Sequence, residues 1–346
     1  MAGTGTAHLR PADDALLRVE ELVVEFRAAG GRTVKAVSGI SFDLVPGETL
    51  GLVGESGCGK STTGRAVLQL PRPTSGRVLF DGLELDELRG NALRAVRPRM
   101  QMVFQDPISS LNPRRKIGDI VAEGLEIAGV GDAASRRERV DEVLAAVGLD
   151  PDAARDRRPH EFSGGQCQRV SIARAVVTEP KLLICDEPVS ALDVSVQAQI
   201  LNLLEAMKAR YELTMVFIAH DLAVVRHVSD RVAVMYLGKL CEVGVPEDLF
   251  ARPAHPYTHA LLAAIPVARA VPRRDDTPVL GGEIPSNTDP PSGCRFHTRC
   301  PRAQAVCADE EPQLRRIGPE QYVACHFPVA PGERLAFPGS AAPVNA

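Results

Sequence analysis

The sequence has no apolar run long enough to cross a membrane. A transmembrane helix needs about 18 consecutive apolar residues, and the best candidates, residues 213–219 and 260–265, are far shorter. Residues 1–11 contain no apolar stretch of the kind that a signal peptide has. We therefore expect a cytosolic protein that reaches a membrane only through partner chains.

The sequence also lacks the basic excess that general nucleic-acid-binding proteins show. Its 40 Lys and Arg residues stand against 44 Asp and Glu residues, which gives a net charge of −4 over 346 residues. This balance argues against nucleic acid as a partner, and no internal repeat is visible. The length is sufficient for two domains, or for one large domain with an appendix.

Strand-like and helix-like patterns alternate along the chain. Apolar alternation or short apolar runs predict strands at residues 16–26, 39–45, 48–54, 181–185 and 213–219. Apolar residues at helical spacing predict helices at residues 62–70, 136–149, 167–177 and 194–211. Residues 89–158 are polar, Arg-rich and helix-like, and residues 232–243 resemble a hairpin that turns at Gly238. This alternation predicts an α/β fold with a largely parallel sheet and a helical insertion.

A glycine-rich loop lies between the strand at residues 48–54 and the helix at residues 62–70. Its residues follow the pattern G-x-x-x-x-G-K-S and are Gly54, Glu55, Ser56, Gly57, Cys58, Gly59, Lys60 and Ser61. Such glycines let successive backbone N–H groups surround phosphate oxygens, helped by the positive end of the following helix. The Lys60 amine would contact the β- and γ-phosphates, and the Ser61 hydroxyl would ligate Mg²⁺. The loop therefore predicts nucleotide binding.

A second apolar strand ends in two carboxylates, Asp186 and Glu187. A buried strand that brings Asp186 to its carboxyl end suits a Mg²⁺-associated acid of a phosphoryl-transfer site. Glu187 is placed to polarise a water for attack on the γ-phosphate. An isolated pair of this kind is more often a solvated turn, but downstream of a phosphate loop the catalytic interpretation is favoured.

A second candidate anion site precedes the helical stretch at residues 167–177. It consists of Ser163, Gly164, Gly165 and Gln166. Ser163 can cap the helix, and the glycines let the first N–H groups approach an anion. An isolated segment of this composition is more often an ordinary capped helix than a ligand site.

Taken together, these motifs resemble the nucleotide-binding subunit of ABC transporters. The matching elements stand in the order of that family: the phosphate loop, Gln105, residues 163–166, Asp186 with Glu187, Asp193 and His220. The resemblance covers about residues 16–250. It implies the P-loop NTPase fold of an ABC ATPase, with an antiparallel β subdomain and a helical subdomain at about residues 107–170.

The resemblance implies a head-to-tail dimer with ATP between the phosphate loop of one subunit and Ser163 of the other. The implied nucleotide contacts are Phe26 on adenine, residues 54–61 and Thr62 around the phosphates, residues 163–166, and Asp193 at the dimer seam. Glu187 would be the base, His220 would hold the γ-phosphate, and Gln105 would contact Mg²⁺ or the attacking water. The implied Mg²⁺ contacts are Ser61, Gln105 and Asp186. By itself, Phe26 would as often be a plain core residue, and His220 would more often be a core histidine than a catalytic one.

Two positions depart from the family pattern. Phe162 stands where leucine is usual, and Cys167 stands where a polar or basic residue is common. Neither departure removes a phosphate contact, so only the local packing is in question.

Two further segments, residues 106–114 and 255–262, resemble the oligopeptide/dipeptide importer branch, which includes nickel importers. We assign them no catalytic role. The expected domains are a flexible N-terminus at residues 1–14, an ATPase domain at 15–250, an oligopeptide-transporter-type extension at 251–330 and a flexible tail at 331–346. Residues 266–291 are expected to be an extended connection because prolines are frequent there.

Four of the eight cysteines fall in the extension: Cys294, Cys300, Cys307 and Cys325, with the spacing C-x5-C-x6-C-x17-C. In a reducing cytosol, clustered cysteines more often ligate a metal or act in redox chemistry than form disulfides. Structural zinc sites usually show closer cysteine pairs. Because similar extensions are associated with [4Fe–4S] clusters, such a cluster is the first interpretation, Zn²⁺ the second and free thiols the third. The spacing alone does not identify the metal.

The expected function is an ATP-hydrolysing subunit that energises import of dipeptides or oligopeptides through ATP-driven closure of the dimer. The implied partners are a second ABC ATPase subunit (a homologous chain or a second copy), two transmembrane permease subunits and, indirectly, an extracytoplasmic solute-binding protein. The chain would lie at the cytoplasmic face of the membrane. A nickel importer ATPase, a non-transport ABC ATPase and a redox-sensing regulator are the alternatives. The solute is not identified, because the specificity pockets lie in other chains.

Overall fold

The computed structural model describes residues 5–264, 283–333 and 335. The chain forms two compact units. The first unit consists of Met1–Leu44, Leu50–Asp86 and His220–Ala346, and the second consists of Val45–Thr49 and Glu87–Ala219. The phosphate loop and the C-terminal extension therefore belong to the same unit.

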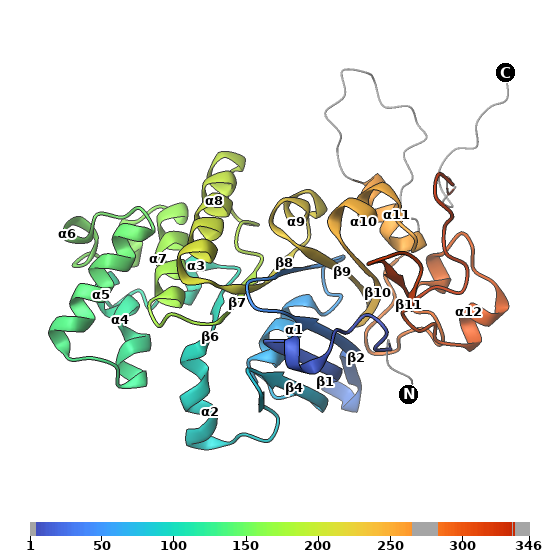
Figure 1. Ribbon diagram of the computed structural model, residues 1–346, viewed down its shortest axis with the longest axis horizontal. Helices are drawn as coiled ribbons and strands as arrows, with labels where there is room; N and C mark the ends of the chain where they lie inside the picture. The colour runs from blue at the N-terminus through green and yellow to red at the C-terminus, as the bar shows by residue number, and fades with distance from the viewer. Residues whose placement is uncertain (1–4, 265–282, 334, 336–346) are drawn as a thin grey trace, which may run out of the picture. The chain divides into compact units, whose positions relative to one another are not determined.

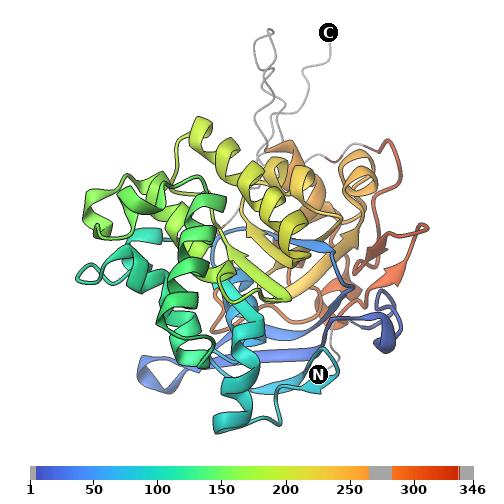
Figure 2. The same ribbon diagram turned by 60° about the vertical axis from the view of Figure 1, so that its left-hand side comes forward.

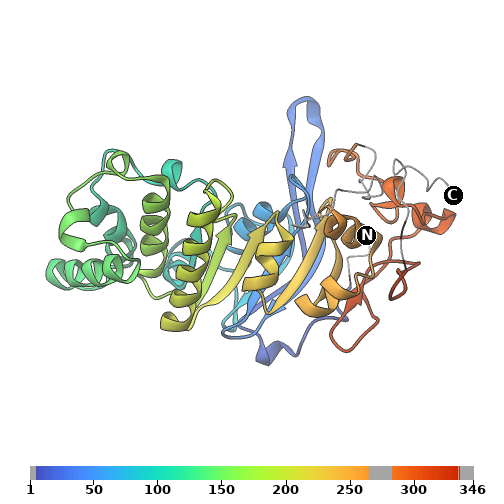
Figure 3. The same ribbon diagram turned by 90° about the horizontal axis from the view of Figure 1, so that it is seen from above.

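An antiparallel sheet of four strands forms part of the first unit. β1 (Leu17–Arg27) pairs with β2 (Thr33–Leu44) and with β4 (Ser75–Phe80), and β5 (Leu83–Glu84) pairs with β4. Figure 3 shows β1 and β2 as one long hairpin. The buried apolar residues of β1 include Leu17, Val19, Leu22 and Val24. Their side chains anchor the sheet in the core, because β-branched and other apolar residues suit a half-buried pleated surface.

A second group of strands in the first unit positions the phosphate loop. β3 (Thr49–Val53), buried at every residue, pairs in parallel with β9 (Arg231–Tyr236). Beyond β9 the pairing is antiparallel, through β10 (Lys239–Gly244), β12 (Tyr322–Val323) and β11 (Arg315–Arg316). Leu237 and Gly238 join β9 to β10 and have φ values of 43° and 77°, as tight hairpin turns require. The predicted hairpin at residues 232–243 is thus confirmed.

The helices of the first unit are α1 (Lys60–Val67), α9 (Leu222–Val228), α10 (Pro246–Ala251), α11 (Pro256–Ala263) and α12 (Ala305–Asp309). α1 packs against β1 and β2, so the helix that follows the phosphate loop rests on the antiparallel sheet. α10 and α11 pack against β10 (Figure 1).

Three parallel strands form the sheet of the second unit: β6 (Met100–Val103), β7 (Leu182–Asp186) and β8 (Thr214–Ala219). Every residue of β7 and β8 is buried. Unbroken apolar runs of this kind are typical of parallel strands that are covered on both faces.

The helices of the second unit are α2 (Gly90–Val96), α3 (Pro107–Ser110), α4 (Ile117–Ala128), α5 (Ala133–Ala146), α6 (Pro151–Ala154), α7 (Gly164–Val176) and α8 (Val194–Tyr211). The green helices α4, α5 and α7 pack against one another (Figure 2). α7 also contacts α3, α8 and β6, and so connects the helices of this unit to its sheet.

The predicted mixed α/β fold is confirmed, with local differences in the bounds and type of some elements. β6 is a strand within residues 89–158, which the polar pattern predicts to be helix-like, because Met102 and Val103 are buried beside β7. α7 begins at Gly164 instead of residue 167, because the Ser163 side chain caps it there. α1 begins at Lys60, two residues before the expected start.

The N-terminal segment differs from the flexible end expected at residues 1–14. His8 is buried with Nε2 2.7 Å from the Ser41 carbonyl oxygen, and Arg10 pairs with Asp43 at 2.6 Å. Residues 1–4 and most of the segments 266–291 and 331–346 lie outside the described residues. In the described ranges, no helix combines the length and the apolar character that a membrane crossing requires.

Candidate functional site

The glycine-rich loop connects β3 to α1 in a conformation that two of its glycines make possible. Gly59 caps α1 with φ 106°, a region that L side chains rarely adopt. A Cβ atom at Gly59 would lie 2.2 Å from the Ala36 carbonyl oxygen, and one at Gly54 would lie 2.0 Å from the Met235 carbonyl oxygen. Both positions therefore accept only glycine, and the loop keeps a backbone that phosphate can approach.

The Lys60 side chain lies within this loop. Lys60 is 4% exposed, and its amine donates to the carbonyl oxygens of Gly54 at 2.8 Å and Glu55 at 3.1 Å. These bonds hold the positively charged amine of Lys60 at the loop, where it can attract phosphate oxygens. Ser61 and Thr62 follow in the first turn of α1 and are partly exposed.

The other contacts predicted in the first unit differ in exposure. Ser56 and Gly57 are exposed, whereas Cys58 is buried and burial raises the pKa of its thiol. Phe26 lies near the end of β1, opposite Val34, and is 40% exposed. Phe26 is therefore not a plain core residue, and its ring is accessible to a ligand.

In the second unit, β7 ends at the two predicted carboxylates. Asp186 is fully buried. Glu187 has φ 47°, and its N–H donates to the Ile218 carbonyl oxygen at 3.0 Å. A left-handed backbone at a residue with a side chain costs about 1–2 kcal/mol, and such strain concentrates at functional positions.

Gln105 holds the side chain of Glu187. Gln105 Nε2 donates to Glu187 Oε2 at 3.0 Å, and Gln105 is exposed just beyond β6. The structure thus brings together the predicted base and the predicted water-contacting amide, which are 82 positions apart in the sequence. This bond fixes the orientation of the carboxylate that would accept a proton from the attacking water.

The Ser163 segment forms the start of α7, a helix of 13 residues. Ser163 Oγ accepts the Gln166 N–H at 3.3 Å, and Gln166 Oε1 accepts the Ser163 N–H at 2.9 Å. This capping box leaves a helix start with Ser163 exposed and two glycines in its first turn. Such a helix start is suited to an anion.

The two departures from the family pattern have local partners. The Arg157 guanidinium lies 4.9 Å from the centroid of the Phe162 ring, a cation–π contact that leucine would not provide. The Cys167 thiol is buried and donates to the Pro159 carbonyl oxygen at 3.4 Å.

Asp193 and His220 are both exposed. Asp193 precedes α8, whose first residue Val194 is 82% exposed. An apolar side chain this exposed is compatible with a surface that a partner covers. His220 directly follows β8. Because its side chain is exposed, it is not the buried core histidine that its place after an apolar strand could suggest.

The four cysteines of the extension line one pocket in the first unit, with His255, His297 and His326. Burial is the largest cause that raises the pKa of Cys294 to about 11 and that of Cys325 to about 12, and the charges of neighbouring cysteines act in the same direction. Among the described residues, no three His, Cys, Asp or Glu side chains are arranged so that they could hold a metal ion. The donor set therefore suits a metal, but its arrangement does not support the predicted cluster or a zinc ion.

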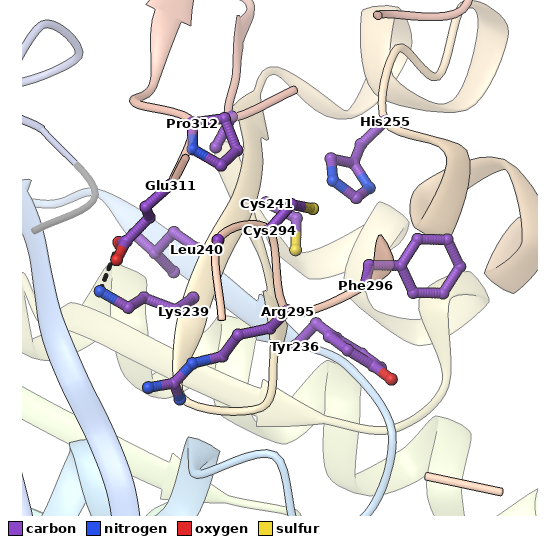
Figure 4. A pocket seen from close by; sticks show the side chains of 12 residues that line it. Tyr236, Lys239, Leu240, Cys241, His255, Cys294, Arg295, Phe296, Glu311 and Pro312 are labelled. Atoms are coloured by element: carbon purple, nitrogen blue, oxygen red, sulfur yellow. Dashed lines mark hydrogen bonds and ion pairs between the residues drawn. The ribbon is translucent and has the colours of Figure 1, made fainter. Parts of the chain in front are cut away.

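A second pocket shares His255, Cys294 and Phe296 with the first. Figure 4 shows Lys239 paired with Glu311 at one side of this pocket and His255 with Phe296 at the other. Both pockets lie within the first unit. Residues of β10 line only the second pocket, whereas residues of the extension line both.

Sequence reasoning missed the residues of the extension that contact the phosphate loop, among them Tyr257 and Arg299. Tyr257 Oη accepts the Glu55 N–H at 2.8 Å, and the Arg299 guanidinium pairs with the Glu55 carboxylate at 2.8 Å. The partners are separated by 202 and 244 positions. The only sequence signal was the resemblance of the surrounding segments to a transporter branch, which does not say what the side chains contact.

Two family models match different parts of the chain. Residues 37–190 match the family model of the ABC transporter, and residues 241–307 match that of the oligopeptide/dipeptide transporter, C-terminal region. The chain is 52% identical over 298 residues to the oligopeptide transport ATP-binding protein AppF of Bacillus subtilis, covering 85% of this chain and 90% of AppF. It is 50% identical over 309 residues to OppF, of the same description, of Escherichia coli, covering 86% and 92%.

Two solved structures are similar in fold. One is cbiO1 of Clostridium perfringens, part of the ABC transporter complex cbiONQ, with TM-score 0.60, 33% identity and coverage of 69% of this chain and 91% of cbiO1. The other is a dimeric post-hydrolysis state of the ATP-binding cassette MJ0796 with ADP and Pi, with TM-score 0.61, 27% identity and coverage of 66% and 98%.

Proposed function

Because the chain belongs to the ABC transporter family, among the ATP-binding proteins of oligopeptide import, we propose that the residues described above form its ATP site. The chain is an ATP-hydrolysing subunit of a peptide importer. The observation that carries the assignment to peptides is the match of residues 241–307 to the C-terminal region of oligopeptide/dipeptide transporters. The names of the relatives favour peptides over nickel as the solute.

In this proposal the phosphate loop binds the triphosphate of ATP. The N–H groups of the loop and the Lys60 ammonium neutralise the phosphates, and the exposed Phe26 ring stacks on adenine. Ser61 and Asp186 would hold Mg²⁺, which when bound supplies charge neutralisation at the phosphates. A hydroxyl and a carboxylate are hard oxygen ligands that fit this ion.

For hydrolysis, we assign the general base to Glu187. Its carboxylate accepts a proton from the attacking water, and Gln105 keeps the carboxylate oriented through the bond described above. His220 would bind the γ-phosphate, for which its exposed position after β8 is suitable. The chemistry is chiefly positioning and charge stabilisation of an in-line displacement.

We further propose that the ATP site is completed by a second ABC ATPase subunit. The exposed start of α7 at Ser163, Gly164, Gly165 and Gln166 would contact the nucleotide of the partner. Asp193 and the exposed Val194 would lie at the seam between the subunits. In this arrangement the start of α1 binds the nucleotide of the same subunit, and the start of α7 contacts the nucleotide of the partner.

The substitution Glu187→Gln tests the assignment of the base. We expect at least a hundredfold loss of ATP turnover, within the range that general base catalysis contributes, with ATP binding retained and a stable dimer in the presence of ATP. Glu205→Gln, at an exposed position of α8, is the matched control and should leave turnover unchanged. Normal turnover in Glu187→Gln would exclude Glu187 as the base.

The remaining partners follow from the function of an importer. We propose that the chain binds two transmembrane permease subunits at the cytoplasmic face of the membrane, and that it acts indirectly with an extracytoplasmic solute-binding protein. Co-purification with the permeases, followed by ATPase measurement with di- and oligopeptides and with Ni²⁺, tests this. If Ni²⁺ stimulated the ATPase activity and peptides did not, the chain would be assigned to a nickel importer instead.

A [4Fe–4S] cluster at Cys294, Cys300, Cys307 and Cys325 stays a prediction. It is supported by four thiols on one pocket, and their present arrangement counts against it. Zn²⁺ and free thiols are the alternatives. Iron, sulfide and zinc analysis of anaerobically purified protein separates the three, and colourless, metal-free, active protein would exclude both metals.

A further inference from the structure

The C-terminal extension holds the phosphate loop at the second residue of the loop, Glu55. Arg299 ends the 3₁₀ turn His297–Arg299, and its guanidinium forms two bonds to the carboxylate, Nη1 to Oε2 at 2.8 Å and Nη2 to Oε1 at 3.2 Å. The side chain of Arg299 is 5% exposed and that of Glu55 is 20% exposed. A paired guanidinium fork fixes the orientation of a carboxylate as well as its charge, and burial limits screening by salt.

The backbone of Glu55 is held as well. Tyr257, fully buried in α11, accepts the Glu55 N–H at its phenolic oxygen. The Tyr257 ring lies 4.7 Å from that of Tyr236 and 5.4 Å from that of Phe296, measured between centroids. Tyr236 Oη also accepts a bond from Arg299 Nη1 at 3.3 Å. The three rings therefore fix both groups that bind Glu55.

A third contact from the extension reaches the middle of the loop. Asn287 Nδ2 donates to the Gly57 carbonyl oxygen at 2.8 Å, and the Asn287 carbonyl oxygen accepts the Lys35 N–H of β2 at 2.9 Å. Gly57 has φ 77°, a backbone conformation that glycine adopts without a steric clash. The extension thus contacts the loop at two positions that precede Lys60.

Arg299 also neutralises the negative charge of Glu55. A carboxylate in a loop that binds a polyanion weakens that binding, because like charges in one site repel each other. An arginine side chain keeps its positive charge in proteins. The Arg299 guanidinium lies 2.8 Å from the Glu55 carboxylate and therefore neutralises it.

We propose that Arg299 and Tyr257 are positioning residues through which the C-terminal extension sets the affinity of the phosphate loop for ATP. This inference rests on the proposed binding of ATP by that loop. A loop that is already ordered loses less conformational freedom when it binds phosphate, and a neutralised Glu55 does not repel the triphosphate. The extension supports the ATP site without touching the nucleotide.

The test measures the Kd of ATP and the steady-state constants for the full chain and four variants: Arg299→Met, Glu55→Gln, the double variant with both changes, and Arg302→Met. Arg302 is the matched control, because it pairs with Glu333 within the extension instead of with the loop. We expect Arg299→Met to raise the Kd and KM of ATP about tenfold, the size expected for a charged, paired hydrogen bond, with kcat changed far less. Arg302→Met should bind ATP as the unchanged chain does.

The Kd of ATP for the double variant shows whether Arg299 acts through the charge and orientation of Glu55 or only supports the fold. Because Glu55→Gln removes the unpaired charge, the double variant should bind ATP within about threefold of Glu55→Gln alone. A merely structural role would leave the double variant as weak as Arg299→Met, and an unchanged Kd in Arg299→Met would also overturn the inference. If Arg299→Met does not fold, Arg299→Lys and Tyr257→Phe replace it, and wild-type affinity in both refutes the proposal. Absence of ATP binding by the unchanged chain would instead refute the proposed function.

Discussion

The buried imidazole of His8 should make the protein less stable in mild acid. His8 is 3% exposed, and its Nε2 lies 2.7 Å from the Ser41 carbonyl oxygen, which can only accept a hydrogen bond. The neutral ring therefore carries its proton on Nε2. Its Nδ1 is buried without a hydrogen-bond partner among the described residues. Protonation would place a second N–H, and a positive charge, where nothing receives it.

Burial is the main cause that lowers the pKa of His8 from 6.5 to about 4, and the nearby charges of Arg231 and Arg18 act in the same direction against that of Asp43. In the unfolded chain His8 therefore binds its proton near pH 6.5, whereas in the folded chain it binds it only near pH 4. The contribution of neutral His8 to the free energy of unfolding is present above pH 6.5 and is lost as the pH falls from 6.5 to 4. The full difference is on the order of 3 kcal/mol, of which about 2 kcal/mol is lost by pH 5.

The assay is urea unfolding at pH 7 and pH 5, followed by circular dichroism, for the unchanged chain and His8→Gln. Glutamine keeps an amide donor for Ser41 but does not titrate, so the free energy of unfolding of the variant should fall by about 2 kcal/mol less between the two pH values. His255 is also buried and neutral, with a pKa lowered by burial to about 3, and Glu242 has a pKa raised by burial. Both are present in both chains, so their contributions cancel. Equal pH dependence in the two chains would refute the reasoning.

Two further predictions concern the loop and the cysteines. Gly59→Ala should abolish ATP binding, because its Cβ meets the Ala36 carbonyl oxygen. Gly57→Ala meets no atom within 4 Å and adds only the cost of a positive φ, so it should weaken ATP binding by about tenfold; equal losses in a nucleotide titration would contradict this difference. In metal-free protein at pH 8, iodoacetamide should modify Cys294 about 100-fold more slowly than in the urea-unfolded chain, because its raised pKa keeps the thiol protonated. Mass spectrometry of the modified peptides checks the rate, which should rise only as the pH approaches 11.

The elements that the sequence predicts well are those whose pattern is local. The boundaries of α8 agree with the predicted residues 194–211, because its apolar spacing and its flanking residues are contained in one segment. The wholly buried strands β7 and β8 are recognisable as short apolar runs. β6 escaped prediction because its four residues take their burial from β7, more than 75 positions away, and lie in a polar, Arg-rich segment.

The same reason explains the N-terminal segment. Residues 5–14 are small and polar, which by composition alone indicates disorder. Their order comes from single side chains with distant partners, His8 on Ser41 and Arg10 on Asp43. Asp43 is itself fully buried on β2 and also pairs with Arg231. A composition argument averages over a segment and cannot detect one buried contact of this kind.

The residues of the candidate site also differ in how well the sequence predicts them. Residues that contact a ligand, such as those of the phosphate loop, recur as motifs because the chemistry of the ligand fixes their type and spacing. Arg299 and Tyr257 act on Glu55 through the fold, so no spacing rule marks them, whereas the cysteines beside them attract attention by type alone.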